Sequence, residues 1–312
     1  KYHLAIVSKP YIPLIADVTL LKPDFTYADS TGKFPKEYSD RNLLSYYVPR
    51  NIAIVKYLQQ QTWVSTKQLV IAGHSEGSTI ATKMAIELKS LDQLKSMRKA
   101  GLVVADTLKL IKESVQVGMT TLELNEIAVA NLIKHDAKSS FLGYHGFPAV
   151  ICASVNEEVV HGIPNKRKLI SGDVLSIDFG AIIDDWHGDA AISFGLGEID
   201  PADQKLMDVC EESMWQGIAA GKNGGRLTDI SAAIESYINS QGKYGILREY
   251  GGHGIGSAMH QEPHILNFGP AGNGPELVPG MALALEPMIT RGNERTKVLS
   301  DDWTVVSQDS SK

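Results

Sequence analysis

Cysteine is scarce in this chain. Only Cys152 and Cys210 occur among 312 residues, too few for the disulfide framework of a small secreted domain. No uninterrupted apolar run approaches the roughly 20 residues that a membrane-spanning helix needs. The chain starts at Lys1 rather than at a methionine, and neither end carries a secretory signal pattern. We therefore expect a cytosolic protein whose printed sequence begins inside a longer reading frame.

Clustered positive charge is also missing. The net charge is −6, and no basic run is longer than the KRK at 166–168. Nucleic acids and anionic membranes attract clusters of Lys and Arg, so we expect neither as the main partner. A hydrophobic fraction of 43% and a charged fraction of 21% are typical of a globular protein with one large domain or two ordinary ones.

A repeated pattern is the most informative feature that is present. Residues 169–178 (LISGDVLSID) and 277–286 (LVPGMALALE) share a leucine, a glycine three positions later, an apolar alternation and a final carboxylate. Each pattern predicts a strand that delivers its acid, Asp178 or Glu286, to a shared interior. Shorter echoes are LNEIAVA at 124–130 with LTDISAA at 227–233, and HGI at 161–163 with HGI at 253–255. We therefore predict an internal duplication with a cleft between two similar halves.

Converging buried carboxylates require a cation or a proton, because an unpaired ionised carboxylate in a dry interior is costly. A predicted hairpin with its turn at 184–185 places Asp178 diagonal to Asp189 on one face. One nitrogen ligand with three carboxylates suits Mn, Fe(II), Co or Zn, and such a set can hold two ions that share an activated water. The candidate metal ligands are Asp178, Asp189, His253 and Glu286.

Two further histidines lie in glycine-rich or turn-rich segments. A neutral imidazole at His161 or His260 would be able to donate a hydrogen bond to a peptide substrate, or accept one from it. An apolar side-chain pocket has its own candidates, which are Tyr144, Phe147, Cys152, Met259 and Trp303.

Residues 1–84 have a different pattern from the rest. GHSEG at 73–77 follows an apolar strand and opens a helix, which is the context of a nucleophile elbow, with Ser75 as the candidate nucleophile. This segment, which includes an expected helix at 51–60, resembles a middle piece of an α/β-hydrolase, but no acid and histidine follow it in the required order. Residue 86 begins the second expected domain, 86–312. There the pattern predicts a helix from Ser90 to near Gly118 and another from Thr120.

Six motifs in this second domain together resemble a bacterial type I methionine aminopeptidase. They are HGIP at 161–164, SIDFG at 176–180, WHGD at 186–189, GHGIG at 252–256, HQEP at 260–263 and LEPM at 285–288. The resemblance implies an α+β pita-bread fold with pseudo-twofold symmetry. It also implies removal of the N-terminal methionine from peptides and nascent proteins, with the ribosome as a further candidate partner.

The resemblance assigns roles to the candidates. It implies that Asp178, Asp189, His253 and Glu286 bind a dinuclear divalent centre (Co, Mn, Fe or Zn) and that Glu286 also relays a proton. It implies that His161 and His260 contact the scissile amide. The residues implied to surround the methionine side chain are Tyr144, Phe147, Cys152, Met259 and Trp303.

One departure from the family concerns a fifth ligand. Members carry a bridging glutamate in a last strand, and the printed sequence ends at Lys312 before that strand. We therefore expect one well-held ion instead of two, reduced activity and an uncovered sheet edge. The possible substitutes Asp301, Asp302 and Asp309 read as turn residues.

Three hypotheses remain open at this point. The chain is a metal-dependent methionine aminopeptidase with impaired activity, a catalytically silent pita-bread module that binds peptides, or a serine hydrolase that acts through Ser75. Proline-specific peptidases and creatinase-like enzymes are further relatives to consider. The HGIP run at 161–164 favours the methionine enzyme.

Overall fold

The computed structural model describes residues 51–57, 60 and 86–312. The chain divides into two compact units, residues 1–85 and 86–312. In the first unit, residues 51–57 form a helix, within the range that the periodicity predicts. Ser75 and the elbow motif around it lie outside the described residues.

The first half of the second unit packs two helices on an antiparallel sheet. The helices begin where the sequence predicts: Ser90 and Thr120 are N-caps, each in a reciprocal capping box with Gln93 or Glu123. The first helix ends at Ser114, short of Gly118. The elements are α4 (Leu91–Ser114), α5 (Thr121–Lys134), β1 (Lys138–Ser139), β2 (Ile151–Val155), β4 (Val174–Ile183) and β5 (Trp186–Gly195).

The β4–β5 hairpin is the longest ladder in this half. Its turn, Asp184 and Asp185, takes positive φ at both residues (52° and 62°), as a two-residue hairpin turn requires. Asp178 pairs with Ala191 and Gly180 pairs with Asp189 in the register. Asp178 and Asp189 are therefore diagonal neighbours on one face, as the sequence predicts.

The second half repeats the helix pair but not the sheet. Its helices are α6 (Pro201–Ala220) and α7 (Leu227–Gln241), and its strands are β6 (Gly245–Ile246), β7 (Gly252–Gly254), β8 (Gln261–Ile265), β9 (Leu283–Ala284) and β10 (Ile289–Thr290). The sheets are ordered β8-β7-β9 and β10-β6. The echoed sequences at 124–130 and 227–233 both lie in helices: 227–233 forms the first turns of α7, whereas 124–130 begins three residues after the start of α5.

The strand predicted at 277–286 is shorter than expected. Only Leu283–Ala284 pairs as β9, and Glu286 follows the strand instead of lying within it. Pro279 and Pro287 lack the amide hydrogen that a ladder needs, which limits pairing at both ends of the segment. Asp178 and Glu286 therefore come from unequal elements despite their matching sequence context.

A third small sheet closes the unit. It has the order β11-β12-β3 and contains β3 (Glu158–Val160), β11 (Thr296–Val298) and β12 (Val305–Ser307). His161 directly follows β3, and the turn between β11 and β12 carries Trp303. A single 3-10 turn, η2 (Tyr144–Gly146), precedes β2.

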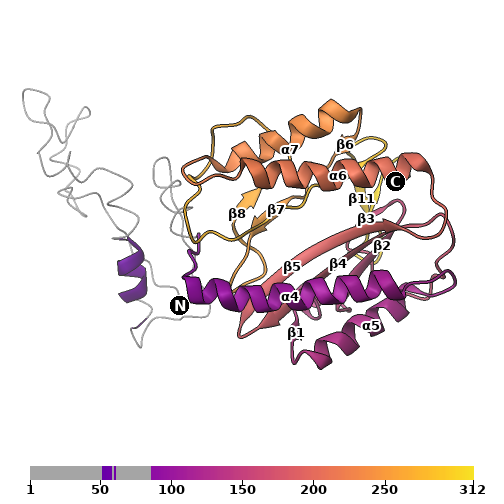
Figure 1. Ribbon diagram of the computed structural model, residues 1–312, viewed down its shortest axis with the longest axis horizontal. Helices are drawn as coiled ribbons and strands as arrows, with labels where there is room; N and C mark the ends of the chain where they lie inside the picture. The colour runs from indigo at the N-terminus through magenta and orange to yellow at the C-terminus, as the bar shows by residue number, and fades with distance from the viewer. Residues whose placement is uncertain (1–50, 58–59, 61–85) are drawn as a thin grey trace, which may run out of the picture. The chain divides into compact units, whose positions relative to one another are not determined.

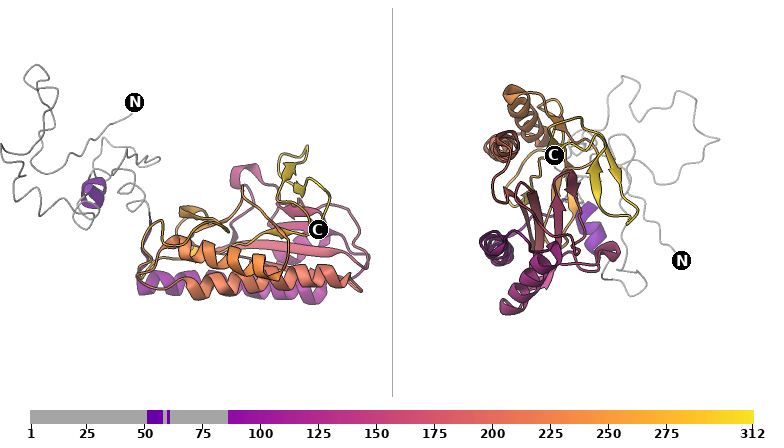
Figure 2. Two further views of the ribbon diagram at one scale, coloured as in Figure 1. Left: turned by 90° about the horizontal axis from the view of Figure 1, so that it is seen from above. Right: turned by 90° about the vertical axis from the view of Figure 1, so that its right-hand side faces the viewer.

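Figures 1 and 2 show the four long helices on one face of the strands. The side chains between helices and strands form two separate apolar cores, one for each half. Ile111, Leu124 and Phe179 are fully buried in the first core, and Ile230 and Ile234 in the second. Among the described residues, no helix is both long and apolar enough to cross a bilayer.

One close backbone contact links α4 to the strand that carries Asp189. A Cβ added to Gly188 would lie 2.6 Å from the amide nitrogen of Gly101 and 2.8 Å from the carbonyl carbon of Ala100. Both neighbours are main-chain atoms and cannot rotate away. Only glycine at position 188 therefore allows β5 to approach α4 so closely.

Gly188→Ala should lower the free energy of unfolding by about 1–3 kcal/mol, because the methyl group forces β5 away from α4. Gly101→Ala is the matched control on the other side of the contact, since its Cβ would meet nothing within 4 Å. That variant should be as stable as the parent or slightly more so, given the helix propensity of alanine. Urea denaturation of the full chain measures both, and equal midpoints for the two variants would contradict the contact.

A candidate metal centre

Three polar side chains from separate elements converge between the two halves. Asp189 lies on β5, His253 on β7, and Glu286 just after β9. Their potential ligand atoms all lie within 4.8 Å of one another. His253 Nε2 is 2.9 Å from Glu286 Oε1 and 3.7 Å from Asp189 Oδ2.

Asp178 joins the group through Asp189. Burial, followed by the charges of Asp189 and Glu286, raises the pKa of Asp178 well above its ordinary value. Burial, followed by the charge of Glu286, raises the pKa of Asp189 to about 7. The two aspartates are close enough to hydrogen-bond to each other, which requires one of them to hold a proton. This pair therefore needs a proton or a cation between its oxygens.

His253 has the same requirement. Its Nδ1 lies 2.9 Å from the carbonyl oxygen of Gly254, an acceptor that fixes the ring hydrogen on Nδ1. The lone pair of Nε2 then faces carboxylate oxygens. Burial lowers the pKa of His253, but the adjacent Glu286 and Asp189 carboxylates outweigh that effect and raise it.

Two buried atoms of this group fit a metal ligand role. His253 Nε2 and Glu286 Oε1 have no hydrogen-bond partner among the described residues, although they lie only 2.9 Å apart. Leaving such polar atoms unsatisfied costs free energy, and a cation bound to both removes the cost. One imidazole and three carboxylates are a donor set suited to divalent first-row metals. The residues therefore fit a divalent cation.

His260 lies beside the ligand group. Its ring centroid is 4.3 Å from that of His253, and its Nδ1 is 2.8 Å from the hydroxyl of Tyr144. Although His260 is exposed overall, burial of its ring and the neighbouring His253 lower its pKa to about 4. His260 is therefore a neutral imidazole near pH 7.

His161 borders the group on another side. It takes a left-handed conformation with φ 60°, which turns the chain sharply after β3. Its ring packs at 6.1 Å from Tyr250 and 6.3 Å from Trp303, measured between centroids. Burial lowers its pKa, so this imidazole is also neutral near pH 7.

An apolar cluster lies next to the carboxylates. Cys152 on β2 pairs with Asp178 on β4, so the cluster and the candidate ligands share neighbouring strands. Burial, followed by the charges of Asp178 and Asp189, raises the pKa of the Cys152 thiol well above its ordinary value. All the predicted pocket residues belong to this cluster or pack against it: Tyr144, Phe147, Cys152, Met259 and Trp303.

Sequence reasoning missed four residues around the site. Phe141, Ala149 and Ile163 belong to the apolar cluster or pack against it, and Tyr250 packs against His161. Phe141 and Ala149 flank the predicted Tyr144 and Phe147, so their nearness in sequence was an available signal. Tyr250 lies two positions before the GHGIG run, but nothing in that position indicates contact with His161.

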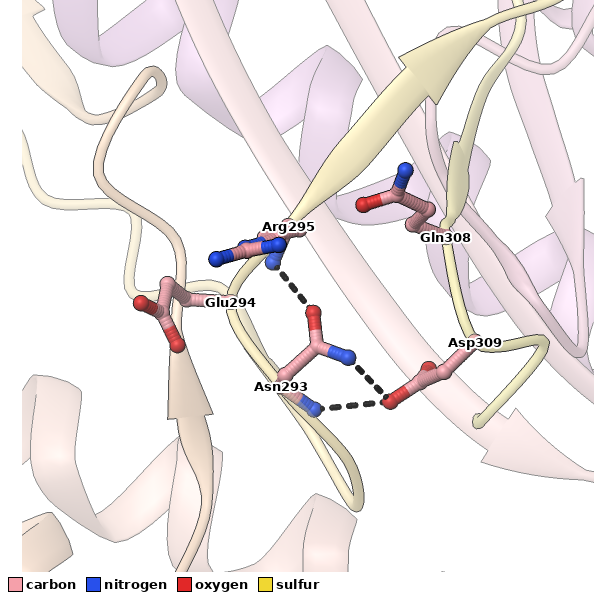
Figure 3. Close-up of a pocket in the computed structure, with 5 residues that line it drawn as sticks. All are labelled: Asn293, Glu294, Arg295, Gln308 and Asp309. Atoms are coloured by element: carbon pink, nitrogen blue, oxygen red, sulfur yellow. Dashed lines mark hydrogen bonds between the residues drawn. The ribbon is translucent and has the colours of Figure 1, made fainter.

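The three aspartates considered as substitute ligands are turn residues, as expected. Asp301 accepts hydrogen bonds from the amides of Trp303 and Thr304, and Asp302 has φ 63°. Asp309 accepts from the amide and side chain of Asn293 at the rim of a surface hollow (Figure 3). That hollow is lined by Asn293, Glu294, Arg295, Gln308 and Asp309, none of which is a candidate for the metal centre or the pocket.

Comparisons with known proteins match the second unit. A family model described as metallopeptidase family M24 matches residues 95–307, a span that includes all four candidate ligands. The chain is similar to the methionine aminopeptidase of Clostridium acetobutylicum, with 46% identity over 227 residues that cover 72% of this chain and 90% of that protein. It is 45% identical over 224 residues to methionine aminopeptidase 1 of Bacillus subtilis, with the same coverage of both chains.

Solved structures resemble the same unit. The crystal structure of methionine aminopeptidase from Rickettsia prowazekii superposes with a TM-score of 0.71 and 38% identity, over 72% of this chain and 91% of that one. Prolidase from Pyrococcus furiosus, at 16% identity, superposes with a TM-score of 0.55 over 70% of this chain and 66% of that one. The second likeness shows a common fold alone.

The pKa of Asp189 sets a pH dependence of stability in the absence of metal. Its folded pKa of about 7 exceeds the ordinary value of 3.8, so the folded chain binds more protons between these values. Burial of the ionised Asp189 carboxylate therefore lowers the free energy of unfolding. This destabilisation is fully present above about pH 7 and disappears as the pH falls toward 4. Asp189→Asn removes that cost.

We expect the metal-free Asp189→Asn variant to gain more stability over the parent at pH 8 than at pH 5, by more than about 1 kcal/mol. Urea denaturation in a chelator measures the difference. Asp185→Asn is the control, because it removes the same charge from the exposed turn of the same hairpin. If the difference in free energy of unfolding between Asp189→Asn and the parent does not change with pH, this carboxyl is not buried as described.

Proposed function

The chain belongs to metallopeptidase family M24, and from this premise we propose that Asp178, Asp189, His253 and Glu286 hold the divalent metal of a methionine aminopeptidase. The protein is a hydrolase with the pita-bread fold, a metal-dependent exopeptidase that removes N-terminal methionine. The identity to the named relatives reaches 46% and extends over 90% of their length.

One observation carries the proposed ligand set. The ligand atoms of Asp189, His253 and Glu286 lie within 4.8 Å of one another, and two of them lack a hydrogen-bond partner among the described residues. A buried set of carboxylates and an imidazole with too few protons and hydrogen-bond partners is destabilised until a cation binds. The energetic cost of this arrangement without a cation supports its assignment as a metal site.

The number of ions is part of the proposal. The ligand atoms of Asp189, His253 and Glu286 surround one position, and Asp178 lies beside it, within hydrogen-bonding reach of Asp189 and close enough for the charge of Glu286 to raise its pKa. We therefore propose one tightly held ion, with Mn(II), Fe(II), Co(II) and Zn(II) as alternatives that this donor set does not distinguish. When bound, a divalent ion lowers the pKa of a coordinated water and polarises a carbonyl oxygen.

The exposure of Glu286 supports a second role for this residue, in proton transfer near that position. Its side chain is 33% exposed, in contrast to 9% for Asp189, so it faces both the ligand group and the solvent-accessible side. A carboxylate in this position accepts a proton from water on one side and returns it to the leaving amine on the other. We assign Glu286 this proton transfer together with its role as a ligand.

His260 and His161 contact the peptide in this proposal. Because both are neutral near pH 7, each carries one N–H and one lone pair. We assign the hydroxyl of Tyr144, 2.8 Å from Nδ1 of His260, as the donor in this hydrogen bond; the ring hydrogen is then on Nε2, free to donate to the scissile carbonyl oxygen. Tyr144 therefore fixes the tautomer of His260.

The apolar cluster next to the ligands suits a methionine side chain. It combines the aromatic rings of Phe147 and Trp303, whose centroids are 5.0 Å apart, with the sulfur atoms of Cys152 and Met259. A thioether makes favourable contacts with aromatic rings and adapts to an irregular cavity. The cluster therefore defines specificity for the first residue of the substrate.

The biological setting follows from the reaction. N-terminal methionine is present on nascent chains, so we propose that the enzyme acts in the cytoplasm on peptides and on chains that emerge from the ribosome. The net charge of −6 is consistent with a substrate reached by diffusion instead of through nucleic acid binding.

His253→Ala should abolish metal-dependent release of methionine from a Met-Ala-Ser peptide. Loss of a direct ligand should weaken Mn(II) affinity by at least about a hundredfold, since even outer partners of ligands contribute about 10–100-fold. His264→Ala is the matched control: it lies opposite His253 in the β7–β8 ladder and is exposed. Calorimetric titration and peptide turnover measure both, and an unchanged affinity in the His253 variant would refute the ligand set.

A chelator should remove the activity, and Co(II) or Mn(II) should restore it. Ser75→Ala should leave metal-dependent turnover unchanged, because the proposed chemistry does not use the hydroxyl at position 75. This pair of measurements separates the metallopeptidase from the alternative serine hydrolase. Hydrolysis that persists in chelator and disappears in Ser75→Ala would establish the serine mechanism instead.

A further inference from the structure

The segment at the start of the second unit contacts the turn that carries His260. We call residues 86–89 the strap and residues 255–260 the His260 turn. The strap precedes α4, and the turn connects β7 to β8. The two segments are about 170 residues apart in sequence but lie side by side, near the start of α4 in Figure 1.

Glu87 makes most of the contacts between them. Its carboxylate accepts a hydrogen bond from the amide of Ser257 (3.1 Å), from the Ser257 hydroxyl (3.0 Å) and from the side-chain amide of Gln261 (2.8 Å). Charge-assisted hydrogen bonds of this kind are about twice as strong as neutral ones. Ser257 within the His260 turn and Gln261 directly after it are therefore tied to a single carboxylate.

Lys89 adds a second contact between the strap and Gln261. Its side chain is only 2% exposed, and its ammonium group donates to the carbonyl oxygen of Glu87 (2.9 Å) and to the side-chain oxygen of Gln261 (3.2 Å). The charged ends of Lys89 and Glu87 are 3.6 Å apart. A buried ammonium requires such partners, so the lysine and the glutamate hold each other in place.

The His260 turn packs closely against the strap at Gly256. A Cβ added to Gly256 would overlap Oε2 of Glu87 and Cε of Lys89. The Gly256 carbonyl also accepts a hydrogen bond from the amide of His187, two residues before Asp189. The strap therefore contacts the His260 turn, and the His260 turn contacts the strand that carries Asp189.

We propose that Glu87 is a positioning residue that holds the His260 turn so that His260 and Met259 face the substrate. This inference rests on the proposed function, because it concerns the same site. The hydroxyl of Ser257 and the side chain of Gln261 bracket Met259 and His260 on both sides, and both are fixed by Glu87. Met259 is 4% exposed in the apolar cluster, and His260 contacts His253 and Tyr144.

The metal ligands do not depend on this contact in the same way. Asp189 is held by the β4–β5 ladder, and His253 pairs with both β8 and β9. Loss of Glu87 should therefore disturb substrate binding and selectivity more than metal binding. That asymmetry separates a positioning role from general stabilisation of the unit.

The experiment compares Glu87→Ala with Glu123→Ala in the full chain. Glu123 is a matched control, because it also accepts hydrogen bonds from a backbone amide and a hydroxyl, those of Thr120, but caps α5 away from the site. We expect Glu87→Ala to raise KM for Met-Ala-Ser roughly tenfold and to reduce the preference for Met over Leu at the first position. Mn(II) affinity should stay within about twofold of the parent.

Two further measurements complete the test. Hydrogen exchange at residues 255–260 should be faster in Glu87→Ala and unchanged in Glu123→Ala, since the Ser257 amide loses its acceptor. Glu87→Gln keeps one acceptor oxygen and should restore part of both the KM and the protection. If Glu87→Ala fails to fold, Glu87→Gln and Ser257→Ala, which loses only one hydrogen bond, replace it.

The outcomes distinguish this inference from the proposed function. Equal losses in the Glu87 and Glu123 variants, or an unchanged KM with unchanged exchange, would overturn the positioning role. A parent chain that releases no methionine in the presence of Mn(II) or Co(II) would refute the proposed function instead. In that case the exchange at residues 255–260 decides the structural part of the inference, and unchanged protection in Glu87→Ala overturns it.

Discussion

Excess negative charge in a dry space is the constraint on which the rest of the structure depends. Asp189 and Glu286 bring two carboxyl groups to Nε2 of His253, Asp178 adds a third beside Asp189, and burial raises the pKa values of both aspartates. Each close contact in this group needs a positive species, a proton or a metal ion. The two helix-backed halves hold these groups against their mutual repulsion, and the stability of the cores balances that cost.

The same site shifts the pKa values of neighbouring groups in opposite directions. The same environment that raises the pKa values of the aspartates leaves His161 and His260 with lowered pKa values, so acids and bases with different proton occupancy lie side by side. Such separation of pKa values is a common mark of catalytic sites. The apolar cluster adjoins the carboxylates through the Cys152–Asp178 pair, so the proposed methionine pocket and the proposed metal site meet where β2 pairs with β4.

Much of this arrangement is readable from sequence because it depends on local periodicity. The β4–β5 hairpin, its register at Asp178 and Asp189, and the capped starts of α4 and α5 follow from alternation, turn residues and capping boxes. The pattern overestimated the strand before Glu286, because prolines at 279 and 287 interrupt pairing. The link between Glu87 and Gln261 has no periodic signal at all, since it joins residues 174 positions apart through side chains.

The strap also affects how the gene for such a protein can be rearranged. The boundary between the two compact units falls at residue 85, and the strap begins at the next residue. A recombination junction upstream of residue 86 keeps Glu87 and Lys89 in the same chain segment as the second unit, residues 86–312. A joint at the start of α4, only a few residues later, would preserve every helix and strand of the fold but separate the His260 turn from its support. On the proposed role of Glu87, a new N-terminal partner must therefore join before residue 86 and not merely before the start of α4.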